Sequence, residues 1–90
     1  MRKPVATIEN WAVLRSAMSQ SFEELHPGNC LMGYVLGHAN LPTTTIVYTS
    51  PIVSFDLSQG VVETRNTLYR LGEASDEYKS WDRKRKAVAA

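Results

Sequence analysis

The sequence predicts an α+β fold: a four-stranded antiparallel β-meander flanked by an N-terminal and a C-terminal helix. Three observations predict this class. Apolar residues recur at helical spacing in the first third of the chain, β-branched and alternating residues fill the middle, and a capped, charged segment lies near the C-terminus. The resulting order α-β-β-β-β-α groups like elements together, which favours an antiparallel sheet with both helices on one face.

The first predicted element is a helix over about residues 8–25. Thr7 is a suitable N-cap, and the segment 26–29, His-Pro-Gly-Asn, ends the helix because its residues favour turn geometry. The apolar residues of this segment are three or four positions apart and form one stripe: Trp11, Leu14, Met18, Phe22 and Leu25.

Four strands are predicted between about residues 31 and 71. The first covers 31–37, with a bulge at Gly33, and the second covers 44–50, where β-branched residues are concentrated. Pro51 cannot donate to a ladder, so it marks a break or an edge. The third strand alternates over 53–57, and a turn at 58–60 joins it in a hairpin to a long fourth strand over 61–71, with a bulge near Asn66.

A second helix is predicted over about residues 76–87. Ser75 is its expected N-cap, and Asp76 and Glu77 occupy the first turn, where the helix dipole favours negative charge. The cations of residues 83–86 occupy the last turn, which the dipole also favours.

Length and composition limit the class of protein. Ninety residues suffice for one modest core, so residues 1–90 are expected to form a single domain. An apolar share of 43% and a charged share of 21% are typical of a globular chain. No apolar run is long enough to span a membrane, and residues 1–4 lack the apolar region of a signal peptide, so a cytoplasmic location is expected.

The formal net charge of +1 hides an uneven distribution. Residues 1–78 carry five Lys or Arg and eight Asp or Glu, a net charge of −3, whereas residues 79–90 carry five and one, a net charge of +4. The sequence therefore predicts an acidic body with a basic C-terminal helix.

Cys30, His26 and His38 are the first candidates for chemistry, because a His near a Cys can generate a thiolate and both types bind zinc. Zinc needs four ligands, and this set offers three. Cys30, the single cysteine, also opens an apolar strand, where a free Cys usually packs as a small hydrophobic residue. A structural role is predicted, with a metal site and a catalytic dyad as alternatives, and no metal or cofactor is expected.

Glu63 and Arg65 lie two residues apart on one predicted strand, and therefore on one face. With His38 as the acid, they would suit RNA cleavage, with Glu as the base and Arg holding the phosphate. A helix followed by an antiparallel sheet is also the layout of small microbial ribonucleases. A salt bridge on a solvated face explains the pair more simply. The run 64–67, Thr-Arg-Asn-Thr, either satisfies backbone groups at the bulge or forms a recognition surface.

Three stretches resemble a family of small uncharacterised bacteriophage and prophage proteins. They are Gly37-His38, residues 49–53 (Thr-Ser-Pro-Ile-Val) and residues 62–72, whose Thr-Arg-Asn-Thr-Leu-Tyr-Arg-Leu-Gly follows the family's Thr-x-Asn-Thr/Ser-x-Tyr-x-Leu-Gly strand. These stretches lie within residues 37–72, a span of about two fifths of the chain that includes neither predicted helix. The resemblance implies no catalytic residue. It implies a phage context, in which small accessory proteins, anti-CRISPR proteins among them, bind and block host machinery.

We therefore expect a non-enzymatic accessory protein that binds and modulates or inhibits a host protein complex, such as a CRISPR or other defence effector. Cations and aromatics dominate binding hot spots, and segregated charge selects partners. The expected interface residues are Arg83, Lys84, Arg85 and Lys86, with Trp81 and Tyr69 as anchors, and Glu73, Asp76 and Glu77 as a second patch. The alternatives are a nucleic-acid-binding module that uses the basic helix and a small ribonuclease-like enzyme. A homo-oligomer formed through an edge near Pro51 is also open.

Overall fold

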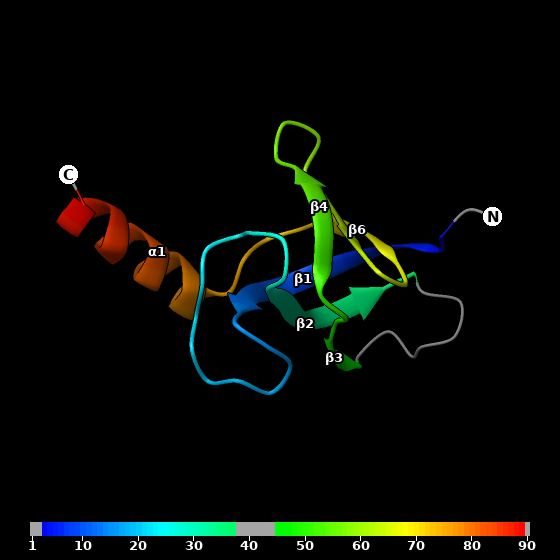
Figure 1. The fold of residues 1–90 in the computed structure, drawn as a ribbon, viewed down its shortest axis with the longest axis horizontal. Coiled ribbons are helices and arrows are strands. Elements are labelled where there is room, and N and C mark those ends of the chain that lie inside the picture. Colours follow the sequence, from blue (N-terminus) through cyan, green and yellow to red (C-terminus); the bar gives the residue numbers. More distant parts are fainter. Residues whose placement is uncertain (1–2, 38–44, 90) are drawn as a thin grey trace.

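Within the residues that the structure describes, the sheet has six strands rather than four, and the first element is a strand rather than a helix (Figure 1). The computed structural model describes residues 3–37 and 45–89. The broad α+β class is confirmed. Its elements are β1 (Val5–Leu14), β2 (Cys30–Leu36), β3 (Ile46–Tyr48), β4 (Ile52–Asp56), β5 (Val61–Thr64), β6 (Leu68–Leu71) and α1 (Asp76–Ala89).

The strand order across the sheet is β3-β2-β1-β6-β5-β4. The β1–β6 pair is parallel, whereas every other neighbouring pair is antiparallel, so the sheet is mixed rather than a simple meander. β3 and β4 lie at opposite edges, yet only residues 49–51 connect them. The sheet must therefore curl strongly, and Ile52 at the start of β4 bonds back to the segment before β2, donating to Asn29 O at 2.8 Å.

The curled sheet encloses one small apolar core. β1, β2, β4, β5 and β6 supply its buried side chains, and α1 adds a single residue at one end. The core residues are Ala6, Ile8, Ala12, Val13, Leu31, Val35, Ile52, Val62, Tyr69 and Tyr78.

The prediction of a helix over residues 8–25 is wrong. Residues 5–14 form β1, and residues 15–29 are a loop that turns back so that Phe22 bridges Leu14. β1 pairs with β2 on one side and β6 on the other, so distant strands rather than local propensity decide its conformation. A bulge in β1 also interrupts the alternation of buried and exposed side chains that is typical of a strand. Ala6 and Ile8 face the core before the bulge, and Ala12, Val13 and Leu14 are all buried after it.

The bulge in β1 requires a glycine on β2. The register shifts between Glu9 and Ala12, and Asn10 adopts a positive φ of 53°. A Cβ on Gly33 would lie 2.8 Å from the Glu9 carbonyl oxygen and 2.9 Å from Ile8 Cγ1. The prediction of a bulge at Gly33 is therefore wrong: the bulge lies on the neighbouring strand β1, and the glycine makes room for it.

The prediction of one long strand over residues 61–71 is also wrong. The chain reverses at residues 65–67, and β5 and β6 pair as antiparallel neighbours. Thr64 and Thr67 close this turn, since Thr64 N donates to Thr67 O at 2.9 Å and Thr67 N donates to the Thr64 hydroxyl at 3.3 Å. The break in the alternation near Asn66 therefore marks a turn rather than a bulge. The two threonines satisfy backbone groups there, which was one of the two interpretations of the run 64–67.

The remaining elements follow the predictions closely. The strand expected over 31–37 is β2, and the hairpin expected around residues 58–60 joins β4 to β5. The strand expected over 44–50 is shorter, Ile46–Tyr48, and its first expected residue, residue 44, lies outside the described residues. Ser75 caps α1 as predicted, because its hydroxyl accepts from Tyr78 N at 3.1 Å.

Replacing Gly33 with alanine should destabilise the fold. The added methyl group meets β1 backbone that cannot move without breaking the ladder, so we expect a loss of about 1–3 kcal/mol in the free energy of unfolding, measured by urea denaturation. Arg70→Ala, at an exposed position on β6, is the control and should change this free energy by less than about 0.5 kcal/mol. Equal stability of the two variants would contradict the tight approach of β1 to β2.

Candidate functional site

Trp11 attaches α1 to the sheet. Its backbone N–H donates to Glu73 O at 3.3 Å, and its carbonyl accepts from Ser75 N at 2.8 Å. Its indole Nε1 donates to Gly72 O at 3.0 Å. Three hydrogen bonds thus fix the segment that precedes the helix, so the position of α1 is set by the central strand β1.

An aromatic cluster holds α1 against the loop 15–29. Tyr78 lies between three rings, with centroid distances of 5.6 Å to Trp11, 5.4 Å to Phe22 and 5.5 Å to Trp81. Phe22 also meets Trp81 edge to face at 6.0 Å. The Tyr78 hydroxyl donates to Glu23 O at 2.5 Å. The loop and the helix are therefore packed together at the end of the sheet.

Two adjoining hollows lie beside this cluster and form one groove. They have volumes of about 350 Å³ and 230 Å³ and share Phe22, Met32 and Glu77. The larger is lined by Asn10, Ala12, Phe22, Met32, Ser75, Asp76 and Glu77. The smaller is lined by Leu14, Met18, Ser19, Gln20, Phe22, Met32, Tyr48 and Glu77. We call the combined surface the acidic groove.

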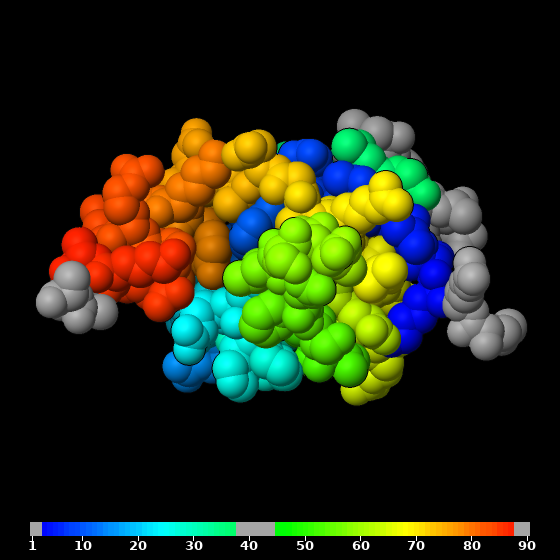
Figure 2. Space-filling model, turned by 90° about the horizontal axis from the view of Figure 1, so that it is seen from above, coloured from blue at the N-terminus to red at the C-terminus, as the bar shows by residue number. Residues whose placement is uncertain are grey.

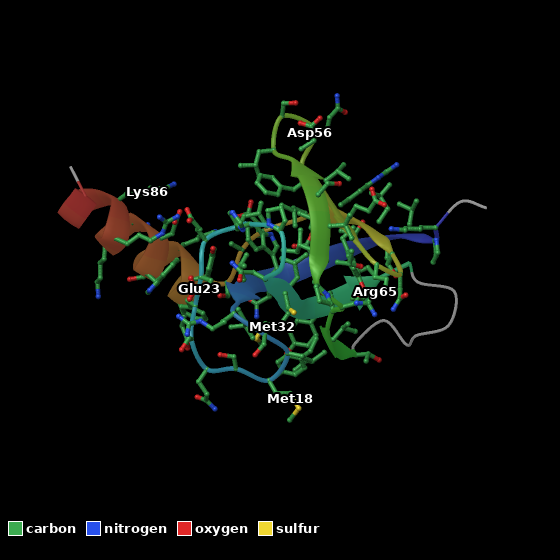
Figure 3. All side chains as sticks on the ribbon, viewed as in Figure 1. Met18, Glu23, Met32, Asp56, Arg65 and Lys86 are labelled. Carbon is green, nitrogen blue, oxygen red and sulfur yellow. The ribbon has the colours of Figure 1, made fainter. Side chains whose placement is uncertain are left out.

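The floor of the acidic groove is apolar and partly open to solvent. Met18 is 79% exposed and Tyr48 is 45% exposed, while Phe22 and Met32 are half-buried. Figure 3 shows Met18 at the bottom of the loop and Met32 on the sheet above it, on one side of the molecule. Methionine side chains adapt to differently shaped partners, and exposed apolar surface of this kind is typical of protein contacts.

Asp76 and Glu77 supply the negative charge of the groove. Both are exposed in the first turn of α1, and neither forms an ion pair with the residues that the structure describes. Glu73, which the sequence placed in the same patch, does not line the groove. It pairs with Lys79 at 2.7 Å, and the hydrogen bond and charge of that lysine lower the pKa of the Glu73 carboxyl. Two carboxylates that form no ion pair within the described residues thus stand beside an apolar floor.

The basic C-terminal cluster is partly neutralised within α1. Asp82 pairs with Arg85 at 2.8 Å and with Lys86 at 3.0 Å. Burial acts to raise the pKa of Asp82, but the bonds and charges of these two cations outweigh it, so the pKa lies below its usual range. Arg83 and Lys84 are exposed and form no ion pair among residues 3–37 and 45–89. Two of the four predicted cations are therefore available to a partner without breaking a bond.

The two predicted aromatic anchors lie in different environments. Trp81 is half-buried in the aromatic cluster, and the guanidinium of Arg85 lies 5.1 Å from the centre of its ring. Tyr69 is only 4% exposed and belongs to the core of the sheet. Trp81 thus supports the basic end of the helix, whereas Tyr69 contributes to folding and presents no surface.

A third hollow, of about 290 Å³, separates α1 from the β4–β5 hairpin, which stands up from the sheet in Figure 1 and faces the viewer in Figure 2. Phe55 and Leu57 line it from the hairpin, and Arg85 and Lys86 line it from the helix. Asp82 and Glu24 lie in the same hollow, so its charges are of both signs and largely paired.

The residues considered for chemistry do not come together in the described part of the chain. Cys30 is buried at the start of β2, whereas His26 is exposed and contacts Pro27 O at 2.8 Å, and His38 lies outside the described residues. Glu63 pairs with Lys3 at 2.5 Å, and that hydrogen bond and charge lower the pKa of its carboxyl, which makes it a weaker base. Arg65 lies in the β5–β6 turn rather than on the strand with Glu63.

Comparisons of the chain with models of protein families, with curated proteins and with solved structures find no match. Within residues 3–37 and 45–89, no helix is long and apolar enough to cross a membrane. The same residues contain no group of three or more His, Cys, Asp or Glu placed to hold a metal ion.

The pH dependence of stability should report the burial of Tyr78. Burial and then the charge of Asp82 raise the pKa of Tyr78 from 10.0 to about 12. Folding therefore favours the protonated phenol. This contribution is fully present below pH 10 and is lost between pH 10 and about 12, where the unfolded chain ionises while the folded protein still holds the phenol proton.

We expect the free energy of unfolding to fall across this interval and to fall less steeply in Tyr78→Phe. Burial also raises the pKa of Tyr69, so part of the slope should remain. Urea denaturation at a series of pH values measures both slopes. Identical slopes in the two proteins would show that Tyr78 is not buried as described.

Proposed function

We propose that this protein is a non-enzymatic binding domain whose acidic groove takes a segment of another protein that carries both apolar and basic side chains. The observation that carries the proposal is the pairing of an apolar floor, Phe22 and Met32, with two carboxylates, Asp76 and Glu77, that have no ion-pair partner in the described chain. An apolar anchor would supply affinity, and the carboxylates would select basic partners and speed encounter.

Charge distribution supports a protein partner over a nucleic acid. The sequence body of residues 1–78 has a net charge of −3, and two of the four clustered cations are bound to Asp82. Arg83 and Lys84 alone offer few phosphate contacts, whereas nucleic-acid-binding surfaces usually present a broad basic stripe. A ribonuclease is also poorly supported. Glu63 is paired with Lys3, and Arg65 lies in the β5–β6 turn rather than on the strand with Glu63.

The resemblance to small phage proteins makes a host protein complex the proposed source of the bound segment. Many proteins that act on nucleic acid carry basic surface segments, and a defence effector of that kind would present one to the groove. Affinity purification from nuclease-treated infected cells would identify that source. The variant with Asp76→Asn and Glu77→Gln serves as the control bait.

The proposal is tested with two pools of fluorescent 12-residue peptides. Both pools contain the same apolar residues, but one carries Lys and Arg where the other carries Glu. Fluorescence anisotropy should show binding of the basic pool only, with an affinity that falls as salt is added. Asp76→Asn with Glu77→Gln should weaken this binding about tenfold, because each rim carboxylate contributes roughly 0.5–1 kcal/mol.

Glu24→Gln with Glu73→Gln is the matched control. It removes the same charge from exposed residues that do not line the acidic groove, so it should leave the affinity within about twofold of the original. Equal binding of the two pools, or an equal effect of the two double variants, would overturn the groove as the site.

A further inference from the structure

β3 presents a strand edge that no other described strand pairs with, and its side chains carry no charge. It is the end strand of the sheet, and it pairs with β2 alone among the described strands. The stretch from residue 45 to residue 55 contains no charged residue. Edge strands are commonly protected by lysine, proline or a bulge, and Ile46–Tyr48 has none of these.

The hydrogen-bonding groups of this edge can be assigned from its register. Val35 N donates to Thr45 O at 3.3 Å, and Thr49 N donates to Leu31 O at 2.9 Å. Hydrogen-bonded pairs alternate with non-bonded pairs along an antiparallel ladder, so the backbone N–H and C=O groups of Val47 also point towards β2. The N–H and C=O groups of Ile46 and Tyr48 therefore point away from β2. These two residues therefore offer two donors and two acceptors at the free edge.

This arrangement is complementary to itself. If a second β3 runs antiparallel about a twofold axis through Val47, Ile46 of one copy lies opposite Tyr48 of the other. Each such pair exchanges two backbone hydrogen bonds, so all four outward donors of the two edges find an acceptor. The side chains of Ile46 and Tyr48, which are 50% and 45% exposed, then meet across the two strands as aliphatic–aromatic pairs.

We propose that two copies of this chain associate through antiparallel pairing of β3 with β3, which joins their sheets across a twofold axis. The neutral strand fits a second copy of itself without placing a charge opposite the edge, whereas β4, the other edge strand, ends in Asp56. Three paired residues make a small interface, so the dimer forms at high concentration and exchanges rapidly. Tyr48 also lines the acidic groove, so the dimer contact adjoins that groove, but it uses neither Asp76 nor Glu77 and does not depend on the proposed function.

Sedimentation of the full chain tests this proposal. The average mass should rise from 10.1 kDa towards twice that value between about 10 µM and about 1 mM, and should stop there because a twofold contact closes. Ile46→Lys should remain monomeric throughout. Val53→Lys places the same charge at a similarly exposed position on β4, 54% against 50%, and should still dimerise.

Cysteine cross-linking fixes the register. The twofold axis places the two Val47 residues directly opposite each other in a non-bonded pair, with Cα atoms about 4.5 Å apart, within disulfide reach. Val47→Cys should form a covalent dimer on mild oxidation, and Val53→Cys should not. A wild-type chain that stays monomeric at about 1 mM, or growth beyond the dimer through β3–β4 pairing, would overturn the proposal. So would dimers that survive Ile46→Lys.

Discussion

The hydrogen bonds of Trp11 place the C-terminal helix, and the acidic groove exists because of that placement. β1 is the longest strand in the described residues, it pairs with β2 and β6, and the backbone of Trp11 within it bonds to the segment before α1. Once Gly72, Glu73 and Ser75 are fixed, the first turn of the helix stands beside Phe22 and Met32. The conformation of β1 therefore underlies three features: the tight approach at Gly33, the aromatic cluster and the groove.

Local sequence signals predicted those parts of the fold that local interactions determine. Ser75 with the two acids after it predicted α1, and the alternation of residues 53–57 with the turn that follows predicted the β4–β5 hairpin. β1 was missed because Trp11 and Phe22 fit a helical stripe by spacing, although they meet at Tyr78 from separate segments. The parallel pairing of β1 with β6 joins residues about 60 positions apart and leaves no local pattern.

The candidate site, like the fold, could be predicted from the sequence only in part. Asp76 and Glu77 were visible as charges in a helix start, but the groove beside them is built by Phe22, Met32 and Tyr48 from three distant segments. The ion pairs of the basic cluster could have been predicted from the sequence. Asp82 precedes Arg85 and Lys86 by three and four positions, the spacing at which helical side chains meet. Tyr69 was predicted as an anchor because aromatic residues dominate hot spots, but its side chain is buried in the core.

Met18, in the acidic groove, and Lys86, in the basic cluster, lie far apart in Figure 3, so one experiment can distinguish binding at the two surfaces. The most direct measurement is NMR of protein labelled at methionine methyl groups and tryptophan indoles during titration with the basic, apolar peptide pool. If the acidic groove is the binding site, the methyl signals of Met18 and Met32 shift together while the indole signal of Trp81 moves little. Shifts confined to Trp81, with both methyl signals unchanged, would contradict the account.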